Sequence, residues 1–184
     1  VIAEDDIAAK RAADKIKVEY EEYPVILDPQ ESMKEDAPLL HEEKPGNVIA
    51  HTGFVLGEGS FEEAVKEEGL TVIEKEYRTQ PVQHCHIEVP VSYAYMEKGR
   101  IVIVTSTQIP HIVRRVVSQA LGIPIGQIRV IKPYIGGGFG NKQDVLYEPL
   151  NAFLCTQAGG RGVRLELSRE ETLGCTRVRH AFTW

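Results

Sequence analysis

One glycine-rich segment, between a strand-like run and a helix-like run, constrains this chain most. Residues 135–144 read Ile-Gly-Gly-Gly-Phe-Gly-Asn-Lys-Gln-Asp, follow the apolar run 128–131, and precede a helix-like run from Leu146. Glycine at this density costs conformational entropy on folding, so it marks backbone with unusual dihedrals or close approach to another group. Peptide N–H groups at the start of a helix can bind anionic or oxo groups. The segment therefore predicts a ligand loop or, on the plainer interpretation, an ordinary strand-to-helix turn.

Neither of two familiar nucleotide loops fits the segment. A phosphate-binding P-loop requires Ser or Thr directly after its lysine, whereas Gln143 follows Lys142 here. A dinucleotide fingerprint requires Gly-x-Gly-x-x-Gly and an acidic residue about 20 residues later. Residues 136–140 do not have that spacing, and Glu166 meets the second condition only by loose counting. We therefore assign neither motif.

Several motifs occur in a fixed order around the glycine loop. Ser-Thr-Gln at 106–108 comes before it, and Gln-His-Cys-His-Ile-Glu at 83–88 lies further upstream; Ser-Arg-Glu-Glu at 168–171 and Arg-His at 179–180 follow it. Together with Gly-Gly-Gly-Phe-Gly-Asn-Lys, they resemble the molybdenum-binding subunit of the xanthine dehydrogenase and aldehyde oxidase family, and its bacterial xanthine dehydrogenases most. The similarity covers roughly residues 70–184, and more faintly the N-terminal part.

The resemblance implies a cofactor site. Gln108 matches the glutamine that hydrogen-bonds a ligand oxygen of molybdenum, and Gly138, Phe139 and Gly140 match loop residues whose backbone lies against the metal centre. In this family the dithiolene of the pterin ligates the metal, so no protein ligand to molybdenum is expected. From spacing alone, Gln108 reads better as a polar residue facing water at the start of a helix.

Gln143 is a candidate substrate-binding residue. It takes the place of a glutamate that recognises the purine in mammalian-type members of the family, so the neutral amide weakens any transfer of purine specificity. A polar residue at a helix start is the equal alternative. No catalytic residue is expected within the chain, because the family's general-base glutamate lies near the C-terminus of the subunit, beyond Trp184.

Other polar residues receive structural interpretations. His84 and His86 share one face of a strand, but no third metal ligand is evident nearby. Glu88 is expected to be a hydrogen-bonding buttress rather than a catalytic carboxylate. Residues 168–171 form a helix-capping motif with solvated acids, and the Arg179-His180 pair receives no assigned role.

The function that the resemblance implies is hydroxylation of a purine, xanthine or hypoxanthine, or of a related N-heterocycle, with water as the oxygen source. The alternatives are an aldehyde or nicotinate hydroxylase of the same family or, for the isolated chain, a non-catalytic α/β interaction module. Iron–sulfur and flavin groups are expected on partner subunits, because the chain has neither a cysteine cluster nor a flavin fingerprint. We expect the chain to be a fragment, because the family's subunit is several times longer, and to be inactive by itself, because the general-base glutamate lies beyond Trp184.

Composition excludes other classes of protein. The chain has 42% hydrophobic and 26% charged residues with a net charge of −6, which suits a globular protein and argues against a nucleic-acid surface. No apolar run approaches the ~20 residues of a membrane helix. The N-terminus lacks the features of a signal peptide. Because Cys85, Cys155 and Cys175 have no C-x-x-C spacing, we expect a cytoplasmic protein.

The expected fold class is α/β (α+β), with mixed sheets and packed helices. We expect residues 1–23 to end a small α/β hammerhead-like domain, 24–59 to connect, and 60–184 to begin a molybdenum-cofactor-binding domain. Apolar periodicity and turn residues predict helices and strands. The expected helices are one capped by Asp5 and Asp6, then 61–67, 110–121 and 147–157; the expected strands are 16–20, 70–77, 91–96, 100–105, 127–131 and 163–167.

Overall fold

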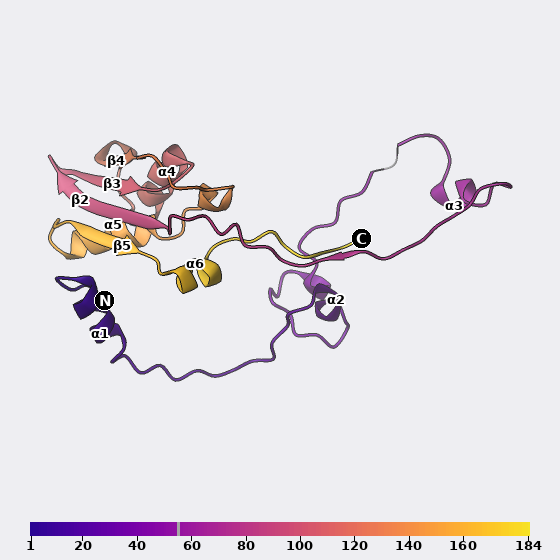
Figure 1. Cartoon of the computed structure of the whole chain (residues 1–184), viewed down its shortest axis with the longest axis horizontal. Coiled ribbons are helices and arrows are strands. Elements are labelled where there is room, and N and C mark those ends of the chain that lie inside the picture. The colour runs from indigo at the N-terminus through magenta and orange to yellow at the C-terminus, as the bar shows by residue number, and fades with distance from the viewer. Residues whose placement is uncertain (55) are drawn as a thin grey trace. The chain divides into compact units, whose positions relative to one another are not determined.

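The structure is a computed structural model that describes residues 1–54 and 56–184. Val1 and Asp5–Glu74 form one compact unit, and Ile2–Glu4 with Lys75–Trp184 form the other. The predicted domain boundaries after residues 23 and 59 stay predictions. The elements in chain order (Figure 1) are α1 Asp6–Ala13, α2 Pro29–Ser32, η1 Pro45–Asn47, α3 Phe61–Ala64, β1 Arg78–Thr79, β2 Val91–Glu97, β3 Arg100–Thr105, α4 Pro110–Leu121, η2 Ile125–Gln127, β4 Ile128–Ile131, η3 Asn141–Gln143, α5 Glu148–Gln157, β5 Val163–Glu166, α6 Arg169–Cys175 and β6 Phe182–Thr183.

A four-stranded mixed sheet organises the second unit. Its strand order is β4-β3-β2-β5, with β3 parallel to β4 and the other neighbours antiparallel. β2 and β3 form a hairpin whose turn places Lys98 at φ 49° and Gly99 at φ 75°. Two consecutive positive φ angles match the right-handed twist of hairpin strands. The expected mixed sheet with packed helices, and the expected hairpin, are confirmed.

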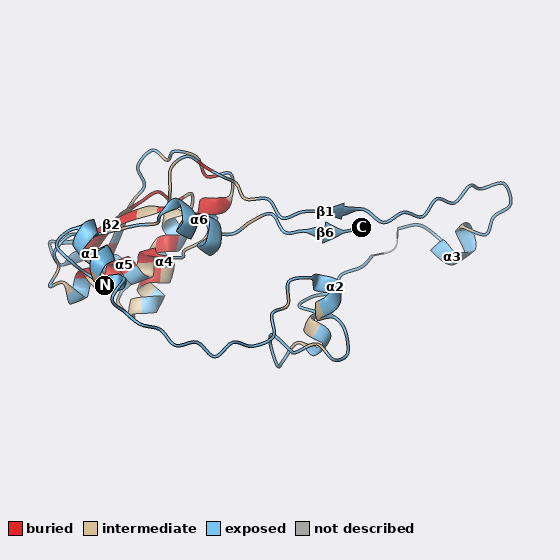
Figure 2. Ribbon diagram, turned by 60° about the horizontal axis from the view of Figure 1, so that its bottom comes forward, coloured by how far each residue is buried: buried red, intermediate tan, exposed pale blue. Residues whose placement is uncertain are grey.

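Two helices build the core against one face of this sheet. Ala94 on β2 pairs with Ile103 on β3, and both are fully buried. Helices α4 and α5 place small and β-branched side chains at helical spacing against them, and Figure 2 shows the buried positions gathered here. The buried apolar cluster comprises Ala94, Ile101, Ile103, Val113, Val117, Ile128, Ala152 and Cys155.

The helix boundaries follow the expected capping residues. Pro110 occupies the first turn of α4, and Gly122 ends the helix in the left-handed region at φ 65°. At α6, the Ser168 side chain accepts from the Glu171 N–H while the Glu171 carboxylate accepts from the Ser168 N–H. Both predicted helix ends are therefore confirmed. None of the helices in the described ranges is long and apolar enough to cross a membrane.

The N-terminal unit has caps but no core. Asp5 caps α1 through a 2.7 Å bond from the Ala8 N–H, as expected, yet no described residue of this unit is buried. The predicted strand at 16–20 is wrong: these residues form no strand, and Tyr20 is 80% exposed. Alternating polarity stabilises a strand only where a partner strand and an apolar surface exist, and the described residues supply neither for this segment.

The predicted strand at 70–77 is also wrong. This segment is irregular, and β1 begins only at Arg78, where it pairs with β6. Tyr77 and Trp184 exchange both main-chain hydrogen bonds at 3.2 and 2.9 Å, so pairing begins where a partner is present. The predicted helix at 61–67 is confirmed at its start but is shorter, because α3 ends at Ala64.

Ile103→Ala tests the core. We expect a loss of about 2–5 kcal/mol in the free energy of unfolding, because the truncation leaves a cavity between the sheet and its helices. Ile125, 47% exposed, provides the matched control; Ile125→Ala should change the free energy by only about 0.5 kcal/mol. Urea titration of both variants measures the difference, and equal losses would contradict this description of the core.

Candidate functional site

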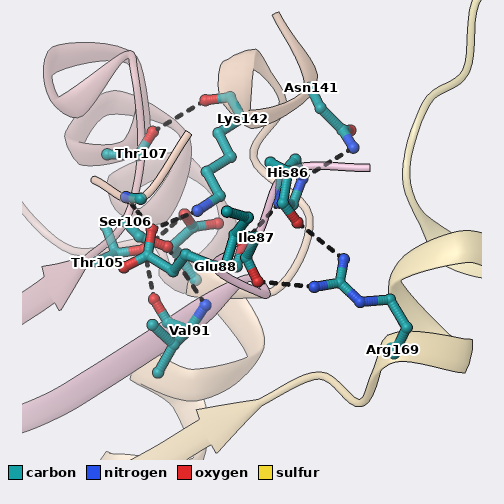
Figure 3. A network of polar contacts seen from close by, with 12 residues as sticks. His86, Ile87, Glu88, Val91, Thr105, Ser106, Thr107, Asn141, Lys142 and Arg169 are labelled. Atoms are coloured by element: carbon teal, nitrogen blue, oxygen red, sulfur yellow. Dashed lines mark hydrogen bonds and ion pairs between the residues drawn. The ribbon is translucent and has the colours of Figure 1, made fainter. Parts of the chain in front are cut away.

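The glycine-rich loop lies beside the junction where β3 leads into α4. The main-chain N–H of Gln108 donates to the carbonyl of Lys142 at 2.9 Å, and the Thr107 hydroxyl lies against the same carbonyl (Figure 3). Thr107 and Lys142 are both buried. The end of a regular strand therefore fixes the position of an irregular loop more than 30 residues later in the chain.

The Gln108 side chain has a defined orientation. Its Oε1 accepts a hydrogen bond from the main-chain N–H of Gly140 at 3.2 Å. A peptide N–H can only donate, so the carbonyl end of the amide must face the loop. Within the described residues, no hydrogen bond uses the other end of the amide, Nε2. Gln108 therefore presents two N–H donors away from its contact with Gly140.

The loop backbone passes very close to this amide. A Cβ atom at Gly138 would lie 2.6 Å from Oε1 of Gln108, so only glycine fits without displacing the side chain. Phe139 and Gly140 have positive φ angles of 51° and 89°, and Phe139 is 73% exposed. Within the described residues, the N–H groups of Gly137, Gly138 and Phe139 donate to no other protein atom.

These features fit a ligand that carries oxygen acceptors. Successive backbone N–H groups in a loop with alternating dihedrals form a concave donor surface for anionic or oxo groups. The Gln108 amide adds further donors beside it. The structure thus brings together the four residues predicted to contact the cofactor, Gln108, Gly138, Phe139 and Gly140. Gln143 lies in the same loop, exposed, on η3.

Glu88 holds the start of the loop. Its Oε2 accepts from the Gly136 N–H at 2.9 Å and from the Lys142 ammonium, while its main-chain N–H donates to the Gly136 carbonyl at 3.2 Å. Burial raises the pKa of the Glu88 carboxyl, but the bonds from Lys142 and Gly136 outweigh burial, so the pKa lies below its ordinary value. The side chain of Glu88 acts as a structural buttress.

His86 and Asn141 pack beneath the loop. His86 is 1% exposed, and its Nδ1 lies 2.6 Å from the Glu88 carbonyl oxygen, so Nδ1 carries the proton. Its Nε2 then accepts from the Asn141 amide at 3.1 Å. Burial, followed by the nearby charges of Lys142 and Arg169, lowers the pKa of His86 below its usual value, so the ring is neutral. Arg169 donates to the carbonyls of His86 and Ile87 (Figure 3).

No metal-binding cluster is present among the described residues: nowhere do three or more His, Cys, Asp or Glu side chains meet in that way. His84 lies on the same short segment as His86, and its buried Nδ1 has no hydrogen-bond partner in the described ranges. Arg179 pairs with Val82 through the main chain, and its guanidinium donates to the Gln80 carbonyl. These contacts are structural.

Sequence reasoning missed a buried polar layer behind the loop. Glu148 is 1% exposed, and its Oε1 accepts from the Thr105 hydroxyl at 3.0 Å, while burial raises its pKa. Burial and then the Glu148 charge raise the pKa of Tyr147 to about 12. A small cavity that Lys142, Tyr147 and Glu148 help to line has about 10 Å³ open to the centre of a water molecule, which is near the minimum needed to hold one. The sequence marked Lys142 only as a member of the glycine-rich motif, without its burial, and nothing marked Glu148.

A glycine loop with free N–H donors beside a fixed amide, presented by a mixed sheet, fits a domain that binds a ligand with oxygen acceptors. Residues 40–184 match the family model of the molybdopterin cofactor-binding domain. The chain belongs to this family. The predicted family, the fold class and the type of cofactor are therefore confirmed.

Single proteins of known type show which members of this family the chain is similar to. It is 48% identical over its whole length to the xanthine dehydrogenase molybdenum-binding subunit of Escherichia coli O157:H7, and it spans 24% of that protein's length. It is 32% identical to the nicotinate dehydrogenase large molybdopterin subunit of Eubacterium barkeri, of which it spans 42%. The crystal structure of the aldehyde oxidoreductase from Desulfovibrio desulfuricans matches 98% of the chain, which covers 20% of that structure, with 27% identity and a TM-score of 0.90.

His86 predicts a pH dependence of stability. An unfolded histidine takes up a proton as the pH falls below about 6.5, whereas the folded state resists protonation because the pKa of His86 is lowered. The contribution of His86 is therefore complete above this pH and is lost below it, with a limiting slope of about 1.4 kcal/mol per pH unit. Urea unfolding between pH 7.5 and 5 measures the slope.

Two variants isolate the contribution of this ring. His86→Gln removes the titrating group, and its stability should depend less on pH than that of the wild type. His111→Gln, at an exposed position on α4, should retain the wild-type slope. The same slope in all three proteins would show that His86 does not cause the dependence.

Proposed function

We propose that this chain is part of a molybdenum hydroxylase and that Gln108, Gly138, Phe139 and Gly140 form part of the environment of its molybdenum–molybdopterin cofactor. The observation that carries this proposal is the contact of Gly140 with Gln108, which turns the amide donors away from the loop. When bound, the cofactor supplies the redox centre that oxidises a carbon of the substrate with oxygen from water. Gln108 and the loop N–H groups bind and orient its oxygen acceptors.

A purine, xanthine or hypoxanthine, or a related N-heterocycle is the proposed substrate. The 48% identity to the xanthine dehydrogenase subunit from Escherichia coli O157:H7 favours this class over others. Gln143 is the proposed substrate contact, because it is exposed on the same loop. Nicotinate and aldehydes are the alternative substrates, supported by the nicotinate dehydrogenase and aldehyde oxidoreductase relatives.

The remaining parts of the enzyme are proposed to lie elsewhere. Iron–sulfur and flavin subunits would accept the electrons, and the general base would come from beyond Trp184. The cytoplasm is the proposed compartment, consistent with three cysteines that form no disulfide. By itself the chain is expected to be inactive, and a non-catalytic interaction module is the alternative for it.

Metal content and turnover test this function. The protein that carries this sequence should be produced with its partner subunits in a host that makes molybdopterin. We expect about one molybdenum per protein and dye reduction that depends on hypoxanthine more than on nicotinate or an aldehyde. Turnover of nicotinate or an aldehyde alone would assign the alternative substrate. A folded complex without molybdenum would overturn the proposal and leave the interaction module.

Gly138→Ala should separate cofactor binding from stability. The added Cβ would displace the flexible end of Gln108, so we expect the unfolding free energy to change by about 1 kcal/mol or less. Loss of a fixed donor beside the reacting centre should lower turnover by about 100-fold. Gly126→Ala is the matched control, since no atom lies within 4 Å of the position of its added Cβ. Equal turnover in both variants would contradict the assigned role of Gln108.

A further inference from the structure

We propose that Glu88 and Lys142 are positioning residues: their ion pair, in which Lys142 is buried and Glu88 is partly exposed, holds the glycine loop in the position at which Gly138 and Gly140 face Gln108. This inference rests on the proposed function, because its consequence is a correctly shaped surface for the cofactor. Neither residue is assigned contact with the cofactor or the substrate.

Glu88 ties the two ends of the loop to one carboxylate oxygen. Oε2 receives the main-chain N–H of Gly136 at the start of the loop and the Lys142 ammonium at its end. A Cβ at Gly136 would lie 2.6 Å from the Cβ of Glu88, so the loop approaches this side chain as closely as it does Gln108. One side chain thus sets the distance between residues that are six positions apart.

Lys142 connects Glu88 to Gln108, the residue whose side-chain amide is proposed to face the cofactor. Its side chain is only 2% exposed and reaches Glu88, while its carbonyl accepts the main-chain N–H of Gln108 at 2.9 Å. Lys142 therefore bonds to Glu88 through its side-chain ammonium and to Gln108 through its main-chain carbonyl. A shift of Lys142 moves the loop relative to Gln108.

The glycine-rich part of the loop, residues 137–140, has little other support. Within the described residues, its hydrogen bonds are the one from Gly140 to Gln108, the one from the Asn141 N–H to the Gly138 carbonyl at 2.8 Å, and the one from the Gln143 N–H to the Gly140 carbonyl at 3.3 Å. Glycine adds no side-chain packing, and the free N–H groups of Gly137, Gly138 and Phe139 gain no stability from protein partners. The conformation of residues 137–140 therefore depends on the ends of the loop, which the Glu88–Lys142 pair and the buried Asn141 amide hold.

The buried charge of Lys142 makes this positioning depend on Glu88. An ammonium taken out of water requires a nearby anion, and Glu88 is the carboxylate that forms an ion pair with Lys142. Glu88→Gln keeps an oxygen that can accept from Gly136, but it leaves the Lys142 charge without its partner. We expect Lys142 to turn toward solvent and to release the end of the loop.

Amide hydrogen exchange tests whether the Glu88–Lys142 pair stabilises the loop, and it needs no bound cofactor. In Glu88→Gln, the hydrogen-bonded amides of Gly136, Gly140 and Asn141 should exchange about tenfold faster, which corresponds to about 1.4 kcal/mol of local stability. The same amides should keep their wild-type rates in Glu97→Gln, which breaks the exposed Arg129–Glu97 ion pair on the same sheet. Unchanged exchange in Glu88→Gln would overturn the proposal.

A double variant distinguishes positioning from stability. Glu88→Gln/Lys142→Met removes both charges of the pair, including the buried ammonium, so global stability in urea should recover toward the wild type. Because the ion pair is still absent, fast exchange of the Gly136, Gly140 and Asn141 amides should persist. If the double variant restored slow exchange as well as stability, the pair would be a charge-balancing feature only, and the positioning role would be wrong.

Molybdenum analysis of the assembled protein completes the test. Glu88→Gln should contain less metal than Glu97→Gln, and the loaded fraction should show a lower kcat per molybdenum with little change in KM. Wild-type metal and kcat in Glu88→Gln would reject the positioning role and leave the proposed function intact. If the wild-type protein lacked molybdenum, the proposed function would fail, and exchange alone would decide on the positioning role.

Discussion

The close approach of the loop backbone at Gly138 to the amide of Gln108 determines the shape of the candidate site. A Cβ at Gly138 would lie 2.6 Å from Oε1 of Gln108, so the loop can come this close to the amide only if residue 138 is glycine. The buried pairing of β2 with β3 holds one partner in place, since Gln108 follows the last strand residue closely. The glycine loop supplies the other partner, the backbone at Gly138. A rigid sheet and a flexible segment thus form one binding surface.

Polar burial explains how an irregular loop keeps a single shape. His86, Asn141, Lys142 and Glu148 are each less than 5% exposed, and each has at least one hydrogen-bond partner. A buried polar group without a partner costs free energy, so each bond excludes alternative positions of the loop. The neutral His86 ring, with its proton on Nδ1, is one example. A protonated ring would also carry a proton on Nε2, and that proton would point at the donor N–H of the Asn141 amide.

The regular elements of the second unit were predictable, because apolar periodicity coincides with capping and turn residues at Pro110, Gly122 and Ser168. The strand patterns at 16–20 and 70–77 failed, because alternation shows which face could be buried but not whether a partner exists. Gln108 and the loop were predicted from the family resemblance, since spacing alone favoured a solvent-facing residue. The depth of Lys142 was not predictable, because local sequence does not report a partner 54 positions away.

A high-resolution structure of the cofactor-loaded protein would test the central claim most directly. The quantity to measure is the distance from each end of the Gln108 amide to the nearest oxygen bound to molybdenum. We predict that Nε2 lies about 3 Å from that oxygen, a hydrogen-bonding distance, while Oε1 stays on the Gly140 N–H. If Gln108 were turned away from the cofactor, or if Gly138–Gly140 packed only against protein, the loop would not be the binding surface described above.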